Sequence, residues 1–387
     1  MRPLTYTRPK VMLPLANKPI LEHLLIEAKT AGIKEFILIV GYHDEQVRDY
    51  FGNGGKWGVN IEYCTQRRQL GTADALNLAE GLVDPKFLLI NGDIIVSHQD
   101  ISKLAGSSTH TLGIVAVDDT RDLGVVEVSG DKVVHIYEKV EKPPSHMANA
   151  GLYLFTTDIF HAISQTPKSP RGEYEVTDSL NLMIDNGHHI SYHEVGYWLD
   201  LSYPWDLLSA NESLLAGIEP QNLGEVEENV VIKGAASIGR DTVVRSGSYI
   251  LGPVIIGQNC DIGPNCYIRP YTSIGDSCHI GAAVEVKNSI IMKGSKTPHH
   301  NYVGDSVIGE GCNLGSGTKI ANLRLDKKDI WTASINTKRR KLGAIIGDRV
   351  EIGINATINV GSMIGNDTHI GPGALASGVI LPGSRIF

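Results

Sequence analysis

The stretch Ile256-Gly-Gln-Asn-Cys-Asp-Ile262-Gly-Pro-Asn-Cys-Tyr-Ile268 decides the fold, because a β-branched aliphatic residue returns at every sixth position. The same spacing continues without a break from Ile232 to Val286. A helix repeats at about 3.6 residues and a strand at about 2, so a period of six indicates short strands joined by regular corners. Three such strands make one triangular coil. The pattern therefore predicts a left-handed parallel β-helix of hexapeptide repeats.

The fourth residue after each aliphatic is small, and we expect both series to point inward. Glycine often follows the aliphatic directly, as at Gly257 and Gly281, which we interpret as a tight corner with an unusual backbone conformation. Cysteine repeatedly occupies the small position, at Cys260, Cys266, Cys278 and Cys312. Packing explains these cysteines better than zinc binding, which favours C-x2-C pairs.

The repeat resumes after two interruptions. It runs from Ile308 to Ile320 and again from Ile346 to Ile370. Residues 294–301 and 323–341 lack the hexad and are rich in polar and basic side chains. A solenoid does not need such insertions, and loops on a rigid scaffold often carry chemistry. We therefore expect functional residues in both.

Composition narrows the class of protein. The chain has 387 residues, which favours more than one domain, and a formal net charge of -8, which argues against nonspecific nucleic-acid binding. It has no run of 18 apolar residues and no charged-then-apolar N-terminal segment. We expect a soluble cytoplasmic protein that is not exported and does not bind membranes.

The first half alternates between helical and strand patterns. Strands are predicted at residues 36–40, 59–64, 87–90, 111–117, 124–128, 133–138, 150–155 and 190–195, and helices at 43–51, 72–82, 175–185 and 204–216 and from Ile20 to about Gly32. This alternation predicts a doubly wound, mostly parallel sheet with helices on both faces. Ligands collect at the carboxyl ends of such strands, where Asp93 follows the strand at 87–90. The domains are predicted as 1–217, a linker at 218–224, and 225–387.

Several short motifs together resemble sugar-phosphate nucleotidylyltransferases. They are Arg2-Pro-Leu-Thr, Arg8-Pro-Lys, Asn17-Lys-Pro-Ile, Gln69-Leu-Gly-Thr, Asn91-Gly-Asp, Asn149-Ala-Gly, Arg171-Gly-Glu-Tyr-Glu-Val-Thr-Asp and Tyr197-Trp-Leu-Asp. In the solenoid, Gly294-Ser-Lys-Thr-Pro-His-His-Asn-Tyr-Val-Gly-Asp resembles the active loop of glucosamine-1-phosphate acetyltransferases. The chain therefore resembles the bifunctional acetyltransferase and uridylyltransferase of UDP-N-acetylglucosamine synthesis, most closely its archaeal form.

One departure from that family concerns the start. The resemblance implies a strand and a Gly-Gly-x-Gly-Thr-Arg-Leu loop directly before Pro3, whereas Met1 stands inside that loop. The backbone amides of this loop cradle nucleotide phosphates in the family. We therefore expect the chain as written to transfer nucleotide poorly while it retains acetyl transfer.

For nucleotidyl transfer, the resemblance implies Mg²⁺ on Asp93 and Asp200, and a phosphate contact from Lys10. It also implies UTP or a related NTP and N-acetylglucosamine 1-phosphate as substrates. The remaining implied contacts are Gln66, Gly71 and Thr72 to the nucleotide and Gly124, Glu138 and Asn149 to the sugar.

Plainer alternatives stay open for these residues. Asp93 alternatively caps a turn, and Lys10 is alternatively a solvated surface lysine. Glu141 rivals Glu138 as the match to the Glu-Lys motif of the family, although Glu138 keeps the spacing to Asn149 without a gap.

For acetyl transfer, the resemblance implies acetyl-CoA as donor, glucosamine 1-phosphate as acceptor, and His299, three residues before Tyr302, as the base. A neutral imidazole suits removal of a proton from an amine. His300 is the rival, and a merely exposed loop is the plain alternative. The other implied contacts to the sugar phosphate, the amino sugar or coenzyme A are Arg269, Lys287, Asn313, Asn322, Lys328 and Lys341, the last within the basic run Lys338 to Lys341.

Other functions and the oligomeric state complete the expectations. A translation-initiation exchange-factor subunit shares both folds without sugar chemistry, and ADP-glucose pyrophosphorylases use the solenoid for assembly or sensing. Asp93 and Asp200 are both present, which argues against an exchange-factor subunit. The Lys-x-x-His-x-x-Tyr pattern of Lys296, His299 and Tyr302 argues against an ADP-glucose pyrophosphorylase. Galactosamine 1-phosphate is an alternative acceptor. We expect a homotrimer, because the resembled acetyltransferases bind their substrates between neighbouring solenoids.

Overall fold

The structure is a computed structural model that describes residues 1–120, 122–140 and 142–387. The chain forms two compact units. One is Ile20–Asp200, and the other joins Met1–Pro19 to Leu201–Phe387. The expected domain limits and linker stay a prediction, but the first segment of the chain belongs to the same compact unit as the solenoid.

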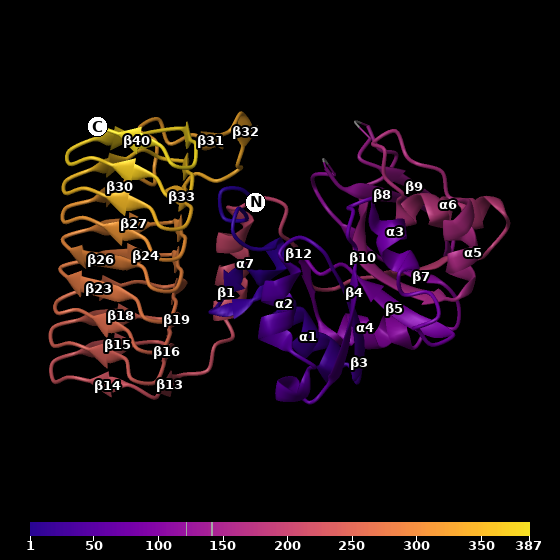
Figure 1. Cartoon of the computed structure of the whole chain (residues 1–387), viewed down its shortest axis with the longest axis horizontal. Coiled ribbons are helices and arrows are strands. Elements are labelled where there is room, and N and C mark those ends of the chain that lie inside the picture. The colour runs from indigo at the N-terminus through magenta and orange to yellow at the C-terminus, as the bar shows by residue number, and fades with distance from the viewer. Residues whose placement is uncertain (121, 141) are drawn as a thin grey trace. The chain divides into compact units, whose positions relative to one another are not determined.

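The unit Ile20–Asp200 alternates helices and strands, as Figure 1 shows. Its helices are α1 (Ile20–Thr30), α2 (Asp44–Phe51), η2 (Gly55–Trp57), α3 (Thr72–Asn77), α4 (His98–Ala105), α5 (Asp158–Gln165) and α6 (Val176–Asp185). Its strands are β3 (Glu35–Val40), β4 (Asn60–Thr65), β5 (Lys86–Ile90), β6 (Ile94–Val96), β7 (Thr111–Ala116), β8 (Gly124–Ser129), β9 (Lys132–Glu138), β10 (Met147–Thr156), β11 (Ser191–Glu194) and β12 (Trp198–Asp200).

The main sheet of this unit has the order β5-β10-β7-β11-β9-β8. The predicted α/β domain followed by a solenoid is confirmed, but the strand directions differ from a mostly parallel sheet. β11 pairs with β7 in parallel, as β3 does with β4, whereas β10 is antiparallel to β5 and β7. β8 and β9 are also antiparallel, because Gly130, at φ +64°, lets the chain turn back directly between them.

Helix α3 is shorter than predicted. Gly71 is its N-cap, and the helix begins at Thr72 as predicted. The turn beyond Asn77 continues with backbone bonds between residues three apart, such as Glu80 N–H to Asn77 and Leu82 N–H to Ala79. These tighter turns replace the helix that was expected to reach Leu82.

The solenoid consists of three parallel sheets that stack coil upon coil in Figure 1. The first sheet contains β13 (Gln221–Asn222), β16 (Ala236–Ile238), β19 (Val254–Ile256), β22 (Thr272–Ile274), β25 (Ile290–Ile291), β28 (Val307–Ile308), β33 (Ala344–Ile346), β36 (Ser362–Ile364) and β39 (Val379–Ile380). The second contains β14 (Glu225–Val226), β17 (Val243–Val244), β20 (Asp261–Ile262), β23 (His279–Ala282), β26 (Lys296–His299), β29 (Asn313–Leu314), β34 (Glu351–Ile352), β37 (His369–Ile370) and β40 (Arg385–Ile386). The third contains β15 (Val231–Lys233), β18 (Tyr249–Leu251), β21 (Tyr267–Ile268), β24 (Glu285–Lys287), β27 (Tyr302–Gly304), β30 (Lys319–Ile320), β35 (Thr357–Ile358) and β38 (Leu375–Ala376).

The hexad residues form one continuous core inside the solenoid. Ile250, Ile268 and Ile280 are fully buried, and the small position is buried as well. Ile232 is an exception, with 39% of its surface exposed, because it lies in the first coil, which has a neighbouring coil on one side only. The inward direction of both series is otherwise confirmed.

The glycines that follow the aliphatic residues serve stacking rather than an unusual backbone conformation. A Cβ on Gly239 would lie 2.5 Å from the carbonyl carbon of Gly257 in the next coil, and one on Gly281 would lie 1.9 Å from Pro298 O. The left-handed backbone falls two residues later, at Asn259 with φ +55° and Ser277 with φ +58°. Our interpretation of these glycines is therefore wrong for most of them, since close coil contact is what excludes a side chain.

The first predicted interruption, residues 294–301, is part of the coils. Its strand β26 pairs with β23 and β29 in the second sheet. Thr297 lies opposite Ile280 and is 2% exposed, so a threonine takes the aliphatic position. The six-residue spacing is hard to recognise here because the steps from Val286 to Ile291 and from Val303 to Ile308 are five residues long.

The second interruption does leave the coils. Residues 323–341 contain the hairpin of β31 (Trp331–Thr332) and β32 (Ile335–Asn336), and an isolated antiparallel bridge joins Leu323 to Lys341 at its base. The other elements of this unit are η1 (Lys10–Met12), β1 (Pro14–Leu15), β2 (Lys18–Pro19) and α7 (Asp206–Leu215).

The solenoid cysteines pack as the sequence predicts. Cys278 donates its thiol to Met292 O at 3.2 Å and Cys312 donates to Gly347 O at 3.0 Å. Burial raises the pKa of both thiols to about 12. Among the described residues, no helix is long and apolar enough to cross a membrane.

Candidate active sites

Asp93 and Asp200, the predicted metal carboxylates, come together at the ends of two short strands. β6 and β12 pair antiparallel with Asp200 opposite Ile94, the residue that follows Asp93. Both aspartates are half-buried. Such a pair suits Mg²⁺, which uses one or two carboxylates and completes its shell with water and phosphate oxygens. Residues 1–120, 122–140 and 142–387 contain no larger cluster of His, Cys, Asp or Glu that could hold a metal.

The predicted nucleotide contacts gather at the start of α3. Gly71 has φ +115°, and a Cβ there would lie 2.2 Å from Tyr174 O, so only glycine fits. Gln66 Nε2 donates to Gly71 O at 3.0 Å. Thr72 Oγ1 accepts the backbone N–H of Val176 at 3.0 Å. The structure therefore brings Gln66, Gly71 and Thr72 together and ties them to the Arg171 motif.

The three predicted sugar contacts also meet. Gly124 lies opposite Glu138 in the β8–β9 ladder. A Cβ on Gly124 would lie 2.9 Å from Glu138 Oε2 and 3.6 Å from Asn149 Cβ. Asn149 Nδ2 donates to the Tyr153 hydroxyl at 2.8 Å, which fixes the amide. The rival Glu141 lies outside the described residues.

Arg171 belongs to this site but received no role from the sequence. Its Nη2 lies 3.3 Å from Glu138 Oε1 and 2.5 Å from Glu175 Oε2. Burial raises the pKa of the Glu138 carboxyl, against the lowering effect of Arg171. The spacing of Arg171 and Glu175 by four residues was the signal that could have identified this pair.

Lys10, the predicted phosphate contact, belongs to the other compact unit. It is the first residue of η1 and is half-buried. Its role at a phosphate and the plain alternative of a surface lysine both stay predictions.

Three predicted residues of the acetyl-transfer site, Lys287, Tyr302 and Asn322, lie around Asp305. Lys287 Nζ lies 3.0 Å from Asp305 Oδ2, and Asn322 Nδ2 donates to the same oxygen at 2.6 Å. Asn322 also donates to the Tyr302 hydroxyl at 3.1 Å, and burial raises the pKa of that hydroxyl. Asp305 itself was missed, because it lies at the second five-residue step where the repeat is hard to follow.

Arg269 lies one coil before Lys287 at the same corner. Its backbone N–H donates to Val286 O at 2.8 Å, and Lys287 follows Val286 directly. The guanidinium pairs with Glu285 at 2.8 Å and lies over the ring of Tyr267. The two cations predicted for a sugar phosphate are therefore adjacent, and each has an acidic partner.

The two rival histidines differ in backbone position. His299 ends β26 opposite Ala282, whereas His300 occupies the following corner with φ +52°. Both side chains are exposed. The His300 carbonyl accepts a bond from Lys319 Nζ. A strand position gives His299 the more regular backbone of the two.

The other predicted contacts are more dispersed. Asn313 lies in the second sheet beside Lys296 and donates to Glu351 at 3.2 Å. Lys328 is exposed on the second insertion, and Lys341 lies at the base of that insertion, paired with Leu323. No described contact joins these three side chains to the corner at Asp305.

Within the basic run at residues 338–341, Arg339 contacts helix α7. Arg339 Nη1 donates to Ser209 Oγ of α7 at 2.6 Å, and its Nη2 lies 3.7 Å from Glu212. Lys341 and Arg340 remain exposed. One cation of the cluster therefore anchors the second insertion to α7.

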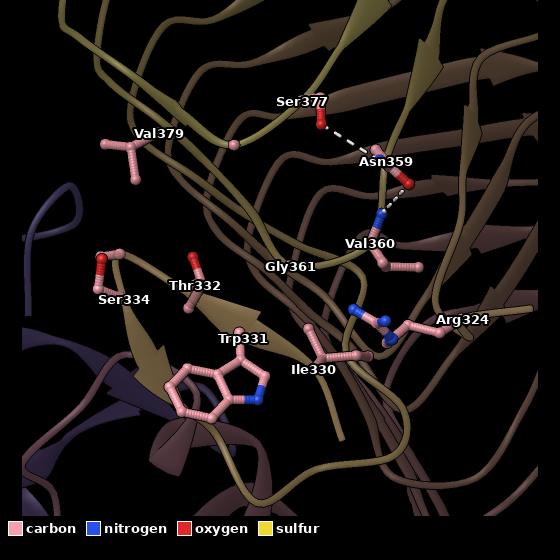
Figure 2. Close-up of a pocket in the computed structure, with 12 residues that line it drawn as sticks. Arg324, Ile330, Trp331, Thr332, Ser334, Asn359, Val360, Gly361, Ser377 and Val379 are labelled. Atoms are coloured by element: carbon pink, nitrogen blue, oxygen red, sulfur yellow. Dashed lines mark hydrogen bonds between the residues drawn. The ribbon is translucent and has the colours of Figure 1, made fainter. Parts of the chain in front are cut away.

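A cavity of 330 Å³ lies between the hairpin and the coils, as Figure 2 shows. Trp331, 58% exposed, contributes an aromatic face from the hairpin, and Arg324 contributes a guanidinium from the start of the insertion. Asn359 and Ser377 line the coil side and are joined by a hydrogen bond of 3.2 Å.

Comparison with known families matches both halves of the chain. The nucleotidyl transferase family model matches residues 1–217, and a model of a GMPPB C-terminal domain matches residues 250–339. A bifunctional sugar-1-phosphate nucleotidylyltransferase/acetyltransferase of Sulfurisphaera tokodaii is 40% identical over 97% of this chain and 94% of its own length. The bifunctional protein GlmU of Methanocaldococcus jannaschii is also 40% identical, over 97% of this chain and 91% of its own length.

A solved structure agrees over part of the chain. A Bacillus anthracis protein assigned as a glucose-1-phosphate thymidylyltransferase superposes with a TM-score of 0.52 and 29% identity. The match covers 57% of this chain and 92% of that protein.

Proposed function

We propose that this chain, which belongs to the family of bifunctional sugar-1-phosphate nucleotidylyltransferases and acetyltransferases, catalyses both reactions in UDP-N-acetylglucosamine synthesis. It transfers an acetyl group from acetyl-CoA to glucosamine 1-phosphate, and a uridylyl or related nucleotidyl group from an NTP to the sugar 1-phosphate with release of pyrophosphate. The carrying observation is that similarity to bifunctional relatives extends over 97% of the chain and so spans both sets of site residues.

In nucleotidyl transfer, Asp93 and Asp200 would hold Mg²⁺, since their paired strands present two carboxylates and hard cations take oxygen ligands. When bound, the ion offsets the negative charge that accumulates as one phosphate attacks another. Lys10 adds a positive contact to phosphate.

The nucleotide and the sugar use two neighbouring groups of residues. Gln66, Gly71 and Thr72 face the nucleotide at the start of α3, where backbone packing leaves room only for glycine. Gly124, Glu138 and Asn149 hold the sugar. A sugar hydroxyl that donates to Glu138 has to share this carboxylate with Arg171.

In acetyl transfer, the sugar amine attacks the thioester carbonyl of acetyl-CoA. The ammonium form has no lone pair, so His299 accepts a proton from the amine. The C–N bond forms, the C–S bond breaks, and the coenzyme A thiolate leaves and takes up a proton. The exposed position of His299 at the end of β26 leaves its ring accessible to a bound sugar.

The acceptor phosphate is assigned to the corner that carries Arg269 and Lys287. Both cations already pair with carboxylates, so the phosphate would take over donor positions that point away from Glu285 and Asp305. Tyr302, Asn313 and Asn322 are assigned to the amino sugar and its surroundings.

Coenzyme A is assigned to the second insertion. The cavity beside Trp331 offers an aromatic face for its adenine ring, and Lys328 and Lys341 offer charge for its phosphates.

We propose a homotrimer in which neighbouring solenoids complete this site, because the flat coils of one solenoid give little enclosure. The need for nucleoside triphosphate and acetyl-CoA supports a cytoplasmic place of action.

Purified protein tests both activities directly. The acetyl-transfer assay measures free thiol after mixing with acetyl-CoA and glucosamine 1-phosphate, with galactosamine 1-phosphate as a second acceptor. The nucleotidyl-transfer assay measures pyrophosphate after mixing with UTP, Mg²⁺ and N-acetylglucosamine 1-phosphate. We expect both products, and a strong pyrophosphate signal would overturn the expectation from the sequence that this chain transfers nucleotide poorly. Pyrophosphate without thiol would favour a solenoid used for assembly or sensing, and neither product would favour a subunit of the exchange-factor kind. Mass measurement in solution tests the trimer.

A further inference from the structure

The segment that carries Lys10 is attached to the solenoid on both sides. Residues 7–17 include the Arg8-Pro-Lys motif and the first residue of Asn17-Lys-Pro-Ile, which resemblance places in the nucleotidyl site. This segment nevertheless lies in the same compact unit as the solenoid, which resemblance assigns to acetyl transfer. The residue that resemblance assigns to the nucleotide phosphate is therefore held within the unit that contains the solenoid.

The first attachment is an ion cluster around the buried Arg8 side chain. Arg8 Nη1 lies 2.6 Å from Glu310 Oε1, and Arg8 Nη2 lies 2.6 Å from Asp348 Oδ2. The Thr7 hydroxyl donates to the same Asp348 oxygen at 2.5 Å. Asp348 Oδ1 accepts the backbone N–H of Glu310 at 2.8 Å, so the two acids are fixed to each other. The Arg8 side chain is 9% exposed and that of Asp348 is 2% exposed, whereas that of Glu310 is 45% exposed.

The second attachment lies at the turn between β1 and β2. Asn17 Nδ2 donates to Ile274 O of the first solenoid sheet at 2.7 Å. The Ala16 N–H donates to Asn211 Oδ1 of α7 at 2.9 Å, and Ser273 Oγ donates to that same oxygen at 2.7 Å. Asn211 is fully buried. Both ends of the segment are thus bonded to the solenoid or to α7.

We propose that Arg8, through Asp348 and Glu310 of the solenoid, is a positioning residue that holds Lys10 in place for nucleotidyl transfer. The inference rests on the proposed function, because the phosphate contact of Lys10 belongs to it. Lys10 lies two residues from Arg8 in the short helix η1 and follows Pro9, whose ring restricts the backbone between them. A shift of the Arg8 guanidinium is therefore transmitted to the backbone of Lys10.

The Arg8–Asp348 pair is suited to this role by its burial. An exposed ion pair contributes little and holds its partners loosely. A buried pair is different, since removal of one partner leaves an uncompensated charge that forces the segment to move or take up water. Arg349 and Asp367 provide the exposed comparison in the same solenoid, bonded at 2.7 Å with about half of each side chain in solvent.

The test compares Arg8→Ala, Arg8→Lys and Asp348→Asn with the control Asp367→Asn in the full chain. We expect Arg8→Ala and Asp348→Asn to lower kcat/KM for pyrophosphate release by roughly 10²-fold, as for a catalytic contact displaced by about 1 Å. Acetyl transfer should stay within about twofold, which also reports that the solenoid is folded. Arg8→Lys should recover part of the loss, and Asp367→Asn should change neither reaction.

Two further measurements separate positioning from general stability. Amide hydrogen exchange over residues 8–17 should speed up in Arg8→Ala and Asp348→Asn and stay unchanged in Asp367→Asn. In a Lys10→Ala background, Arg8→Ala should cause little further loss, because it acts through Lys10. The proposal is overturned if amide exchange over residues 8–17 does not change in Arg8→Ala. It is also overturned if Arg8→Ala lowers pyrophosphate release equally in the wild-type and Lys10→Ala backgrounds. Absence of pyrophosphate release by the unsubstituted chain would refute the nucleotidyl half of the proposed function, and the positioning role with it, even if exchange confirmed the attachment.

Discussion

Asp100 Oδ1 lies 3.1 Å from His193 Nε2, and the two residues come from α4 and β11. The same carboxylate accepts the backbone N–H groups of Gly196 at 3.1 Å and Tyr197 at 3.3 Å. Asp100 is only 3% exposed. It therefore fixes the turn that leads directly into β12, the strand that ends at Asp200.

Asp100→Ala should lower the free energy of unfolding by roughly 2–3 kcal/mol at pH 7, because buried donors lose a charged acceptor. Burial alone would raise the pKa of the Asp100 carboxyl, but bonds from Ser97, Gly196, His193 and Tyr197 hold that pKa below its ordinary value. Folded Asp100 therefore binds fewer protons than unfolded Asp100. Its stabilising contribution is present above the unfolded pKa of about 3.9 and is lost as the pH falls through the folded pKa.

Urea unfolding of wild type and Asp100→Ala at a series of pH values measures this contribution. The difference in unfolding free energy should be constant near neutral pH and shrink toward zero in acid. The control is Asp131→Ala, since the Asp131 side chain is 89% exposed. A difference in unfolding free energy that grows in acid would contradict the lowered pKa of the Asp100 carboxyl in the folded protein.

Asp93→Asn and Asp200→Asn should each abolish most pyrophosphate release while leaving acetyl transfer unchanged. The amide keeps the shape of the side chain but removes the charge that Mg²⁺ requires. Mn²⁺ binding by calorimetry in the presence of UTP gives a readout besides activity and should weaken in both variants. Asp84→Asn, a change of an acid not placed in the site, serves as the control.

His299→Ala should reduce acetyl transfer by roughly 10² to 10⁴-fold, as expected for loss of a general base. Because the His299 side chain is exposed, circular dichroism and melting temperature should not change. His300→Ala is the matched control, one residue away and equally exposed. If only His300→Ala removes activity, the base has been assigned to the wrong histidine.

Ile268→Ala should destabilise the solenoid by roughly 2–5 kcal/mol, because the truncated side chain leaves a cavity in a fully buried core. Ile232→Ala, in the same repeat series but 39% exposed, should cost much less. Chemical denaturation followed by circular dichroism compares them. Equal losses would mean that the first coil is packed as tightly as the middle of the solenoid.

The solenoid could be predicted from the sequence because each coil buries the same position, so the pattern is local and repeats many times. The predicted repeat was interrupted where another residue type can take the buried aliphatic position or where a coil is one residue shorter. Thr297 fills an aliphatic position, and two five-residue steps shift the phase. These changes made the strand β26 look like an inserted loop.

The sites were less predictable because they depend on pairings between distant strands. Resemblance selected Asp93 and Asp200, but the short β6–β12 pairing that joins them leaves almost no periodic signal. Arg171 and Asp305 were missed for a related reason, since a buried or paired charge is recognised only through its partners. The direction of the strands in the main sheet likewise follows from hairpins, which hydrophobic periodicity does not report.

The attachment of Arg8 to Asp348 also sets an order of events when the protein is made. The two residues are separated by 340 positions. At about 5–20 residues per second, the ribosome needs roughly 20 to 70 s after Arg8 to supply its partner. During this interval the whole of Ile20–Asp200 is already synthesised. The segment that carries Arg8 is thus made well before the coils that it binds, and the newborn protein has to keep this segment unattached until those coils form.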